Sequence, residues 1–136
     1  MIELSHIHKS FNETEVIKGI DLKVNQGEVV TLIGRSGSGK TTLLRMINAL
    51  EIPTEGTVYV NGMTYNAKDK KSQIKVRQQS GMVFQNYNLF PHKSALENVM
   101  EGLITVKKMN KATANEEAMN LLAKVGLVHV KDQRPH

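Results

Sequence analysis

The chain lacks cysteine and tryptophan, and aromatic residues make up only 4% of its 136 positions. Without cysteine there is no disulfide framework and no thiolate site for zinc or an iron–sulfur cluster, as is typical of a reducing compartment. With so few aromatic rings, any core must be built from Ile, Leu, Val and Met, which favours an α/β class. Because no apolar run approaches the ~20 residues of a membrane span and no signal-peptide pattern is present, we expect a cytoplasmic chain.

The net charge of +5 is concentrated in one basic stretch, residues 68–77. A nucleic-acid interface would combine such a patch with aromatic side chains or place it on a recognition helix, and neither pattern is visible. We therefore expect a solvated loop and helix face, and no nucleic-acid partner. The stretch contains Lys68, Lys70, Lys71, Lys75 and Arg77, with Asp69 among them.

Apolar periodicity predicts several strands. Residues 2–8 and 16–24 alternate apolar and polar side chains, which indicates an antiparallel pair of half-buried strands. The nearly continuous apolar runs at 28–33 and 81–84 are typical of strands buried on both faces of a parallel sheet. Asn61-Gly62, between alternating apolar residues, predicts a tight hairpin.

The helices are predicted from apolar spacing and capping residues. A helix is expected over residues 40–50, where apolar side chains recur at helical spacing. In the last third of the chain, Ser94 with Glu97 and Thr113 with Glu116 have the spacing of capping boxes, which mark helix starts.

The segment GRSGSGKT, residues 34–41, matches the pattern G-x-x-x-x-G-K-[ST] and lies between a predicted strand and a predicted helix. Gly37 and Gly39 allow left-handed backbone that brings amides to phosphate oxygens, and the helix start adds its free N–H groups. Lys40 would reach the β and γ phosphates, and the Thr41 hydroxyl would ligate Mg²⁺. We therefore expect a nucleoside triphosphate site, formed by Gly34, Arg35, Ser36, Gly37, Ser38, Gly39, Lys40, Thr41 and Thr42.

Phe11 lies in the predicted turn between the first two strands. Its ring could stack on an adenine base. An ordinary half-buried Phe would be at least as consistent with the sequence alone.

Three segments in this order resemble the ATP-binding subunits of ABC transporters: SFNETEVIKGIDL, GEVVTLIGRSGSGKTTLLRMINALEIPTEGTVYVNG and SGMVFQNYNLFPHKSALENV. They look most like the ATPases of bacterial importers for polar amino acids such as glutamine, arginine and histidine. The resemblance implies an α/β P-loop NTPase core. It assigns residues 1–27 to an antiparallel β part, 28–93 to the nucleotide-binding core with P-loop and Q-loop, and 94–136 to the start of a helical subdomain.

The resemblance also implies site residues and partners. Phe11 would be the adenine-stacking aromatic, and Gln85 the Q-loop glutamine that contacts Mg²⁺ and the region of the attacking water, so Lys40 and Gln85 are the expected catalytic residues. The region from Tyr87 to Leu96 would contact membrane permease subunits, or its apolar side chains would instead pack beneath the helix after Ser94. The family implies ATP and Mg²⁺, a homodimer, and a peripheral place at the cytoplasmic face of the membrane.

The sequence departs from the family pattern in two ways. It contains no LSGGQ signature, which would be expected directly after His136, and no Walker B strand ending in Asp-Glu. By family the chain is an ATP hydrolase coupled to amino acid uptake, but alone we expect it to be inactive and marginally stable. The alternatives are a non-hydrolysing nucleotide-binding fragment and a soluble ABC ATPase acting on nucleic acid or ribosomes.

Overall fold

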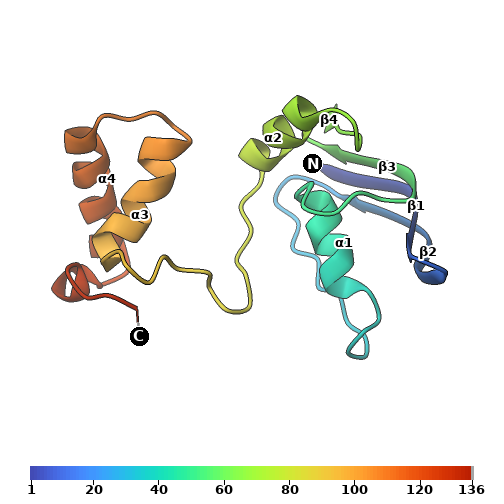
Figure 1. The fold of residues 1–136 in the computed structure, drawn as a ribbon, viewed down its shortest axis with the longest axis horizontal. Coiled ribbons are helices and arrows are strands. Elements are labelled where there is room, and N and C mark those ends of the chain that lie inside the picture. Colours follow the sequence, from blue (N-terminus) through green and yellow to red (C-terminus); the bar gives the residue numbers. More distant parts are fainter. Residues whose placement is uncertain (136) are drawn as a thin grey trace. The chain divides into compact units, whose positions relative to one another are not determined.

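The chain divides into two compact units, Met1–Met82 and Val83–His136, and the computed structural model describes residues 1–135 (Figure 1). Each unit has its own cluster of buried apolar side chains. The three-part division at residues 27 and 93 stays a prediction. In the part of the chain that the structure describes, no helix is long and apolar enough to cross a membrane.

The first unit is built on a four-stranded antiparallel sheet with the strand order β2-β1-β3-β4. The strands are β1 (Ile2–Phe11), β2 (Thr14–Val24), β3 (Glu55–Val60) and β4 (Met63–Thr64). The predicted antiparallel pair of β1 and β2 is confirmed. The predicted hairpin is also confirmed, because Asn61 and Gly62 both have positive φ, 50° and 75°, as a two-residue turn of this kind requires.

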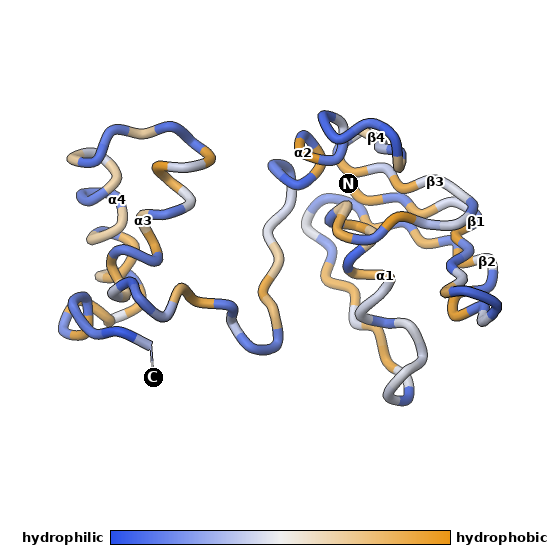
Figure 2. The backbone as a smooth tube through the Cα atoms, viewed as in Figure 1, coloured by the Kyte–Doolittle hydropathy of each residue, from blue (hydrophilic) through white to orange (hydrophobic). Residues whose placement is uncertain are grey.

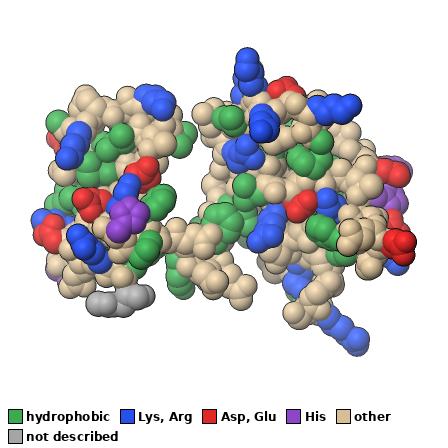
Figure 3. All heavy atoms as spheres, viewed as in Figure 1, with side chains coloured by type: hydrophobic (Ala, Val, Ile, Leu, Met, Phe, Trp, Pro, Cys, Tyr) green, Lys and Arg blue, Asp and Glu red, His purple; other side chains and the backbone are tan. Residues whose placement is uncertain are grey.

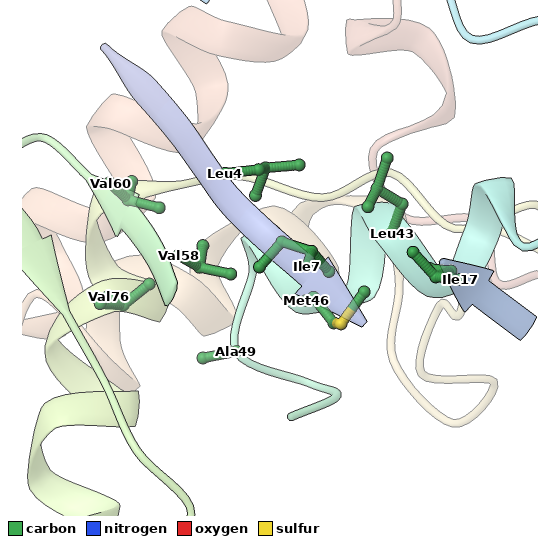
Figure 4. Packing of buried hydrophobic residues seen from close by; sticks show 9 residues of the cluster. All are labelled: Leu4, Ile7, Ile17, Leu43, Met46, Ala49, Val58, Val60 and Val76. Carbon is green, nitrogen blue, oxygen red and sulfur yellow. The ribbon is translucent and has the colours of Figure 1, made fainter. Parts of the chain in front are cut away.

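Two helices, α1 (Lys40–Ile47) and α2 (Lys70–Gln79), complete the first unit. Figure 4 shows nine buried side chains of this core, which come from β1, β2, β3, both helices and, for Ala49, the segment after α1. Leu43 and Met46, three positions apart on one face of α1, contribute the helix side of this core. The core therefore fixes α1 against the sheet.

The helix predicted over 40–50 ends earlier, at Ile47. Ala49 has a φ of 48°, the amide of Leu50 donates to the Arg45 carbonyl, and the amide of Ala49 donates to the Met46 carbonyl. This is the hydrogen-bond pattern of a Schellman motif, in which one left-handed residue ends the helix. Apolar spacing continues through the motif, which is why periodicity alone overestimates the length of the helix.

The strands predicted at 28–33 and 81–84 are wrong, since neither segment has strand structure. Val29, Ile33 and Val83 are 94%, 92% and 87% exposed. Figure 2 colours part of the segment between β2 and α1 as hydrophobic, and Figure 1 draws this segment without a strand arrow. A strand needs a neighbour for its backbone groups, and the four strands described in residues 1–135 pair only with one another.

The basic stretch lies largely on α2, and its four lysines are exposed, as predicted, whereas Arg77 is half-buried and donates to the Ala49 carbonyl. Lys70, Lys71 and Lys75 are on the solvent side, and Figure 3 shows several Lys or Arg side chains over this helix. Asp69 caps α2 by accepting hydrogen bonds from the amides of Lys71 and Ser72. The positive charges are therefore placed on the surface of a capped amphipathic helix.

The second unit contains α3 (Ala95–Thr105), α4 (Lys111–Lys124) and a short 3₁₀ helix, η1 (Val128–Val130). The capping box of Ser94 and Glu97 is confirmed, with both reciprocal hydrogen bonds present. The box predicted for Thr113 and Glu116 is wrong, because α4 begins earlier. Asn110 is its N-cap and accepts a hydrogen bond from the Thr113 amide. Asn caps a helix at least as well as Thr does, so the helix starts at the Asn.

The carboxyl end of α1 is held by two side chains from distant parts of the first unit. The Tyr65 hydroxyl donates to the carbonyls of Met46 and Glu51, and Arg77 Nη1 donates to the Ala49 carbonyl at 2.7 Å. Burial, and then the charge of Glu51, raise the pKa of Tyr65, so the hydroxyl keeps the proton that it donates. These donors therefore fix the last turn of α1 and the segment that follows it.

Replacing Tyr65 with phenylalanine is expected to lower the free energy of unfolding by about 1–2 kcal/mol, because partly buried carbonyls lose their donor. Urea unfolding of the purified chain measures the change. Tyr59→Phe is the matched control, since Tyr59 is exposed on β3 and should change stability by only a few tenths of a kcal/mol. Equal effects of the two substitutions would contradict the role of Tyr65.

The capping box also makes α3 sensitive to pH. The hydrogen bond from the Ser94 amide lowers the pKa of the Glu97 carboxyl below its usual value. The ionised form is therefore favoured by folding: its contribution is present above the unfolded pKa and is lost as the pH falls through the folded pKa. We expect helix content to fall as the pH drops below the ordinary pKa of a glutamate, about 4.3.

Circular dichroism during an acid titration checks this expectation. Glu97→Gln can still accept the hydrogen bond but cannot titrate, so it should reduce the pH-dependent part of the signal. Glu116→Gln, on an exposed turn of α4, is the control and should leave that part unchanged. If both substitutions alter the titration alike, the capping box is not its source.

Candidate functional site

The segment 34–39 forms a loop that opens directly into α1. Gly37 and Gly39 have φ values of 80° and 88°, in the left-handed region that favours glycine. Gly39 is the N-cap of α1 but supplies no side-chain hydrogen bond. The first bond of the helix runs from the Leu43 amide to the Gly39 carbonyl, which leaves the amides of residues 40–42 open at the amino end of the helix.

Gly39 packs closely against β2. A Cβ atom at this position would lie 3.1 Å from Ile17 Cγ1 and 3.2 Å from Val16 Cγ1. Ile17 is buried in the core of the first unit. The end of the loop is therefore seated on β2, and only glycine fits both the conformation and the space.

Lys40 folds back over the loop. Its amino group donates to the carbonyls of Gly34 and Arg35 at 2.8 and 2.7 Å, and makes a longer contact of 3.4 Å to Ser38 Oγ. The Ser38 amide closes the same turn by donating to the Arg35 carbonyl. A positive charge is thus held beside the open amides of α1, and both attract an anion.

A cavity of about 560 Å³ joins the loop to the end of β1. Phe11, the last residue of β1, lines it from one side and is 44% exposed. The cavity is lined by Phe11, Val16, Ser36, Gly37, Gly39, Lys40, Thr41 and Thr42. The structure therefore brings Phe11 and most of the expected phosphate-binding residues together. Gly34, Arg35 and Ser38 do not line the cavity but contact the Lys40 amino group.

Sequence reasoning missed two residues beside this cavity. Val16 lines it from β2, and Lys9 lies with its amino group 4.8 Å from the centre of the Phe11 ring. Lys9 and Phe11 are two positions apart on one strand and so share a face. That spacing was the only feature of the sequence that could have placed Lys9 near Phe11. No sequence motif includes Val16.

Gln85 belongs to the second unit and is exposed in a turn. The amide of the nearby Tyr87 donates to the Phe84 carbonyl at 3.0 Å, and Tyr87 itself has a φ of 58°. The role of Gln85 in binding Mg²⁺ stays a prediction.

The region from Tyr87 to Leu96 is anchored by its backbone, and Leu96 packs against the core of the second unit. Asn98 on α3 accepts from the Phe90 amide at 2.8 Å and donates to the Phe90 carbonyl at 3.2 Å. Tyr87, Leu89 and Phe90 are all exposed rather than packed beneath α3. Leu89 lines an apolar groove of about 340 Å³ together with side chains from α3 and α4.

Comparison with known protein families and relatives identifies what the chain is similar to. The family described as "ABC transporter" matches residues 17–136. The chain is 51% identical to the probable amino-acid ABC transporter ATP-binding protein of Haemophilus influenzae, across 99% of this chain and 54% of that protein. It is 52% identical to the glutamine transport ATP-binding protein GlnQ of Escherichia coli, across 93% of this chain and 52% of that protein.

Solved structures give the same result for the fold. A dimeric structure of MJ0796, a bacterial ABC transporter cassette, superimposes with a TM-score of 0.87 at 34% identity, across 99% of this chain and 62% of that one. A post-hydrolysis dimer of MJ0796 bound to ADP and phosphate gives a TM-score of 0.86. These neighbours confirm the predicted α/β cassette class. The chain spans about half the length of the curated relatives it matches, 54% in the first case.

The close contact of Gly39 with β2 predicts that two similar substitutions lower the free energy of unfolding by different amounts. Gly37→Ala and Gly39→Ala both place a side chain on left-handed backbone, but nothing lies within 4 Å of a Cβ at Gly37. We expect Gly39→Ala to lower the free energy of unfolding by about 1–3 kcal/mol more than Gly37→Ala, because β2 must shift. Urea unfolding of the two variants measures the difference, and equal losses would show that the contact with β2 is not tight.

Proposed function

This chain belongs to the ABC transporter family, and on that basis we propose that its first unit binds ATP at the amino end of α1. The observation that carries this proposal is the set of open amides at residues 40–42, three residues that line the same cavity. Backbone N–H groups, the helix dipole and a lysine ammonium are the elements that hold phosphate in proteins.

Lys40 can donate a hydrogen bond to a phosphate oxygen without giving up its two short bonds to the loop. An ammonium has three donors, and two of them are used in short bonds to the Gly34 and Arg35 carbonyls. The third contact, to Ser38 Oγ at 3.4 Å, is long and therefore weak. A phosphate oxygen would replace that contact at little cost and gain a charge-assisted hydrogen bond.

The base would lie toward Phe11. The cavity runs from the loop to this ring and is also lined by Val16, so two of its lining side chains are apolar. Its volume falls in the range of about 300–1,000 Å³ that is usual for small-molecule sites. A purine stacks on an aromatic face, and we assign that role to Phe11.

The Mg²⁺ site is proposed at Thr41, whose exposed hydroxyl lines the cavity beside Lys40. The ion would supply charge neutralisation between phosphate groups during phosphoryl transfer. The amide of Gln85 is the second proposed ligand. Lys40 would act by stabilising negative charge on the phosphates, and Gln85 by orienting water near the ion.

For the whole protein, we propose an ATP-hydrolysing subunit of an importer for polar amino acids. Relatives named for transport of glutamine, arginine, cystine and histidine support this substrate class. The partners would be a second copy of the protein and membrane permease subunits, which place it at the cytoplasmic face of the membrane. We propose that a permease subunit contacts the exposed side chains of the Tyr87 to Leu96 region, which are Tyr87, Leu89 and Phe90. No observation favours the nucleic-acid alternative.

Replacing Lys40 with alanine tests the phosphate site. We expect the dissociation constant for Mg²⁺-ATP, measured by titration calorimetry, to rise about 10- to 100-fold, because a charge-assisted hydrogen bond is lost. Lys75→Ala, on the exposed face of α2, removes an equal charge and should leave the constant nearly unchanged. An unaltered dissociation constant for Lys40→Ala would overturn the site assignment.

The same variants test turnover. Because LSGGQ and a Walker B strand are absent from the sequence, we expect this chain alone to bind ATP without sustained phosphate release. A steady release that Lys40→Ala abolishes would show that the residues present are sufficient for hydrolysis.

A further inference from the structure

Lys9 is held in place by three contacts at once. Its amino group lies 2.7 Å from Glu51 Oε1 and 2.7 Å from the carbonyl oxygen of Ile52, and 4.8 Å from the centre of the Phe11 ring. Only 12% of the Lys9 side chain is exposed. An ammonium within about 6 Å of a ring centre attracts the ring face electrostatically, so a fixed cation rests against Phe11.

Phe11 lines the cavity, whereas Lys9 does not. Lys9 therefore contacts the ring without being one of the residues that line the cavity. Lys9 also binds Glu51 and Ile52 in the segment that follows α1. It therefore links the ring at the end of β1 to this segment.

We infer that Lys9 is a positioning residue for base recognition: its fixed ammonium holds the Phe11 ring in place before a purine binds. This inference rests on the proposed function, because it assigns a partner to the proposed base-stacking residue. The end of a strand is a place where an exposed ring can rotate, and fixing such a ring before binding saves the entropy that binding would otherwise cost. Contact with a cation also withdraws electron density from the ring, which favours stacking with an electron-rich purine.

The inference predicts different effects on the binding of ATP and of inorganic tripolyphosphate, two ligands that both contain a triphosphate chain. Lys9 acts on the base and not on the phosphate chain, so its loss should weaken binding of ATP but not of inorganic tripolyphosphate. We expect Lys9→Met, which keeps the length and apolar stem of the side chain, to raise the dissociation constant of ATP about three- to tenfold. The constant for tripolyphosphate should stay within about twofold.

Two further variants separate the ring contact from the ion pair. Lys9→Arg keeps a cation that can lie on the ring and should restore ATP binding to near the original value. Glu51→Gln removes the charge partner but keeps an oxygen that can accept from Lys9, and it should leave the ratio of the two dissociation constants unchanged. Urea unfolding of every variant, together with its tripolyphosphate binding, shows whether the loop is still folded.

A double-mutant cycle with Phe11→Leu tests whether Lys9 acts through the ring. If it does, Lys9→Met should have almost no effect on ATP binding once Phe11 is absent. An equal effect in both backgrounds would overturn the inference, and so would a parallel loss of ATP and tripolyphosphate binding, which would show a purely structural role.

The outcomes also distinguish this inference from the proposed function. If the unaltered chain binds neither ligand, the phosphate site itself is wrong. If it binds both with equal affinity, the phosphate site stands, but base recognition by Phe11 and Lys9 is excluded.

Discussion

The close contact of Gly39 with β2 determines where the phosphate-binding loop lies. A side chain there would meet Val16 and Ile17 at just over 3 Å, so the backbone can approach the strand only because glycine has no Cβ. Ile17 belongs to the buried core. The packing of the sheet therefore fixes the position of the loop. The amino end of α1 is fixed at this contact, and the open amides follow from it.

The rest of the first unit fixes the other parts of α1. Leu43 and Met46 hold the middle of the helix on the sheet, while Tyr65 and Arg77 bind carbonyls at and just beyond its carboxyl end. A helix dipole is useful to a ligand only if the helix cannot tilt, since the donors must already point at the anion when it arrives. The hydrogen bonds at the far end of α1 therefore serve the phosphate site even though none of them lies near it.

How much of this could be read from the sequence depends on the range of each interaction. The loop, the hairpin at Asn61-Gly62 and the cap at Ser94 are set by residues a few positions apart, and all three could be predicted from local patterns. The strand expected at 28–33 could not be judged in this way, because periodicity reports which side chains are apolar but not whether a neighbouring strand is present to pair with. Val16 and Lys9 were missed for a related reason: the contact of Val16 with Gly39, and those of Lys9 with Glu51 and Ile52, join segments that are far apart in the sequence.

The two flanks of the loop differ in what holds them. On the helix side, Gly39 is packed against β2. On the other side, the 28–33 run forms no strand within the described residues, and apart from Leu32, which packs against the core, its apolar side chains are exposed. Lys40 joins this flank to α1 through the carbonyls of Gly34 and Arg35. Because those two bonds use only two of the three ammonium donors, the lysine can keep the loop closed and still offer a proton to a phosphate oxygen. Lys40 is therefore part of the structure of the loop, and this role does not compete with the anion-binding role that we propose for it.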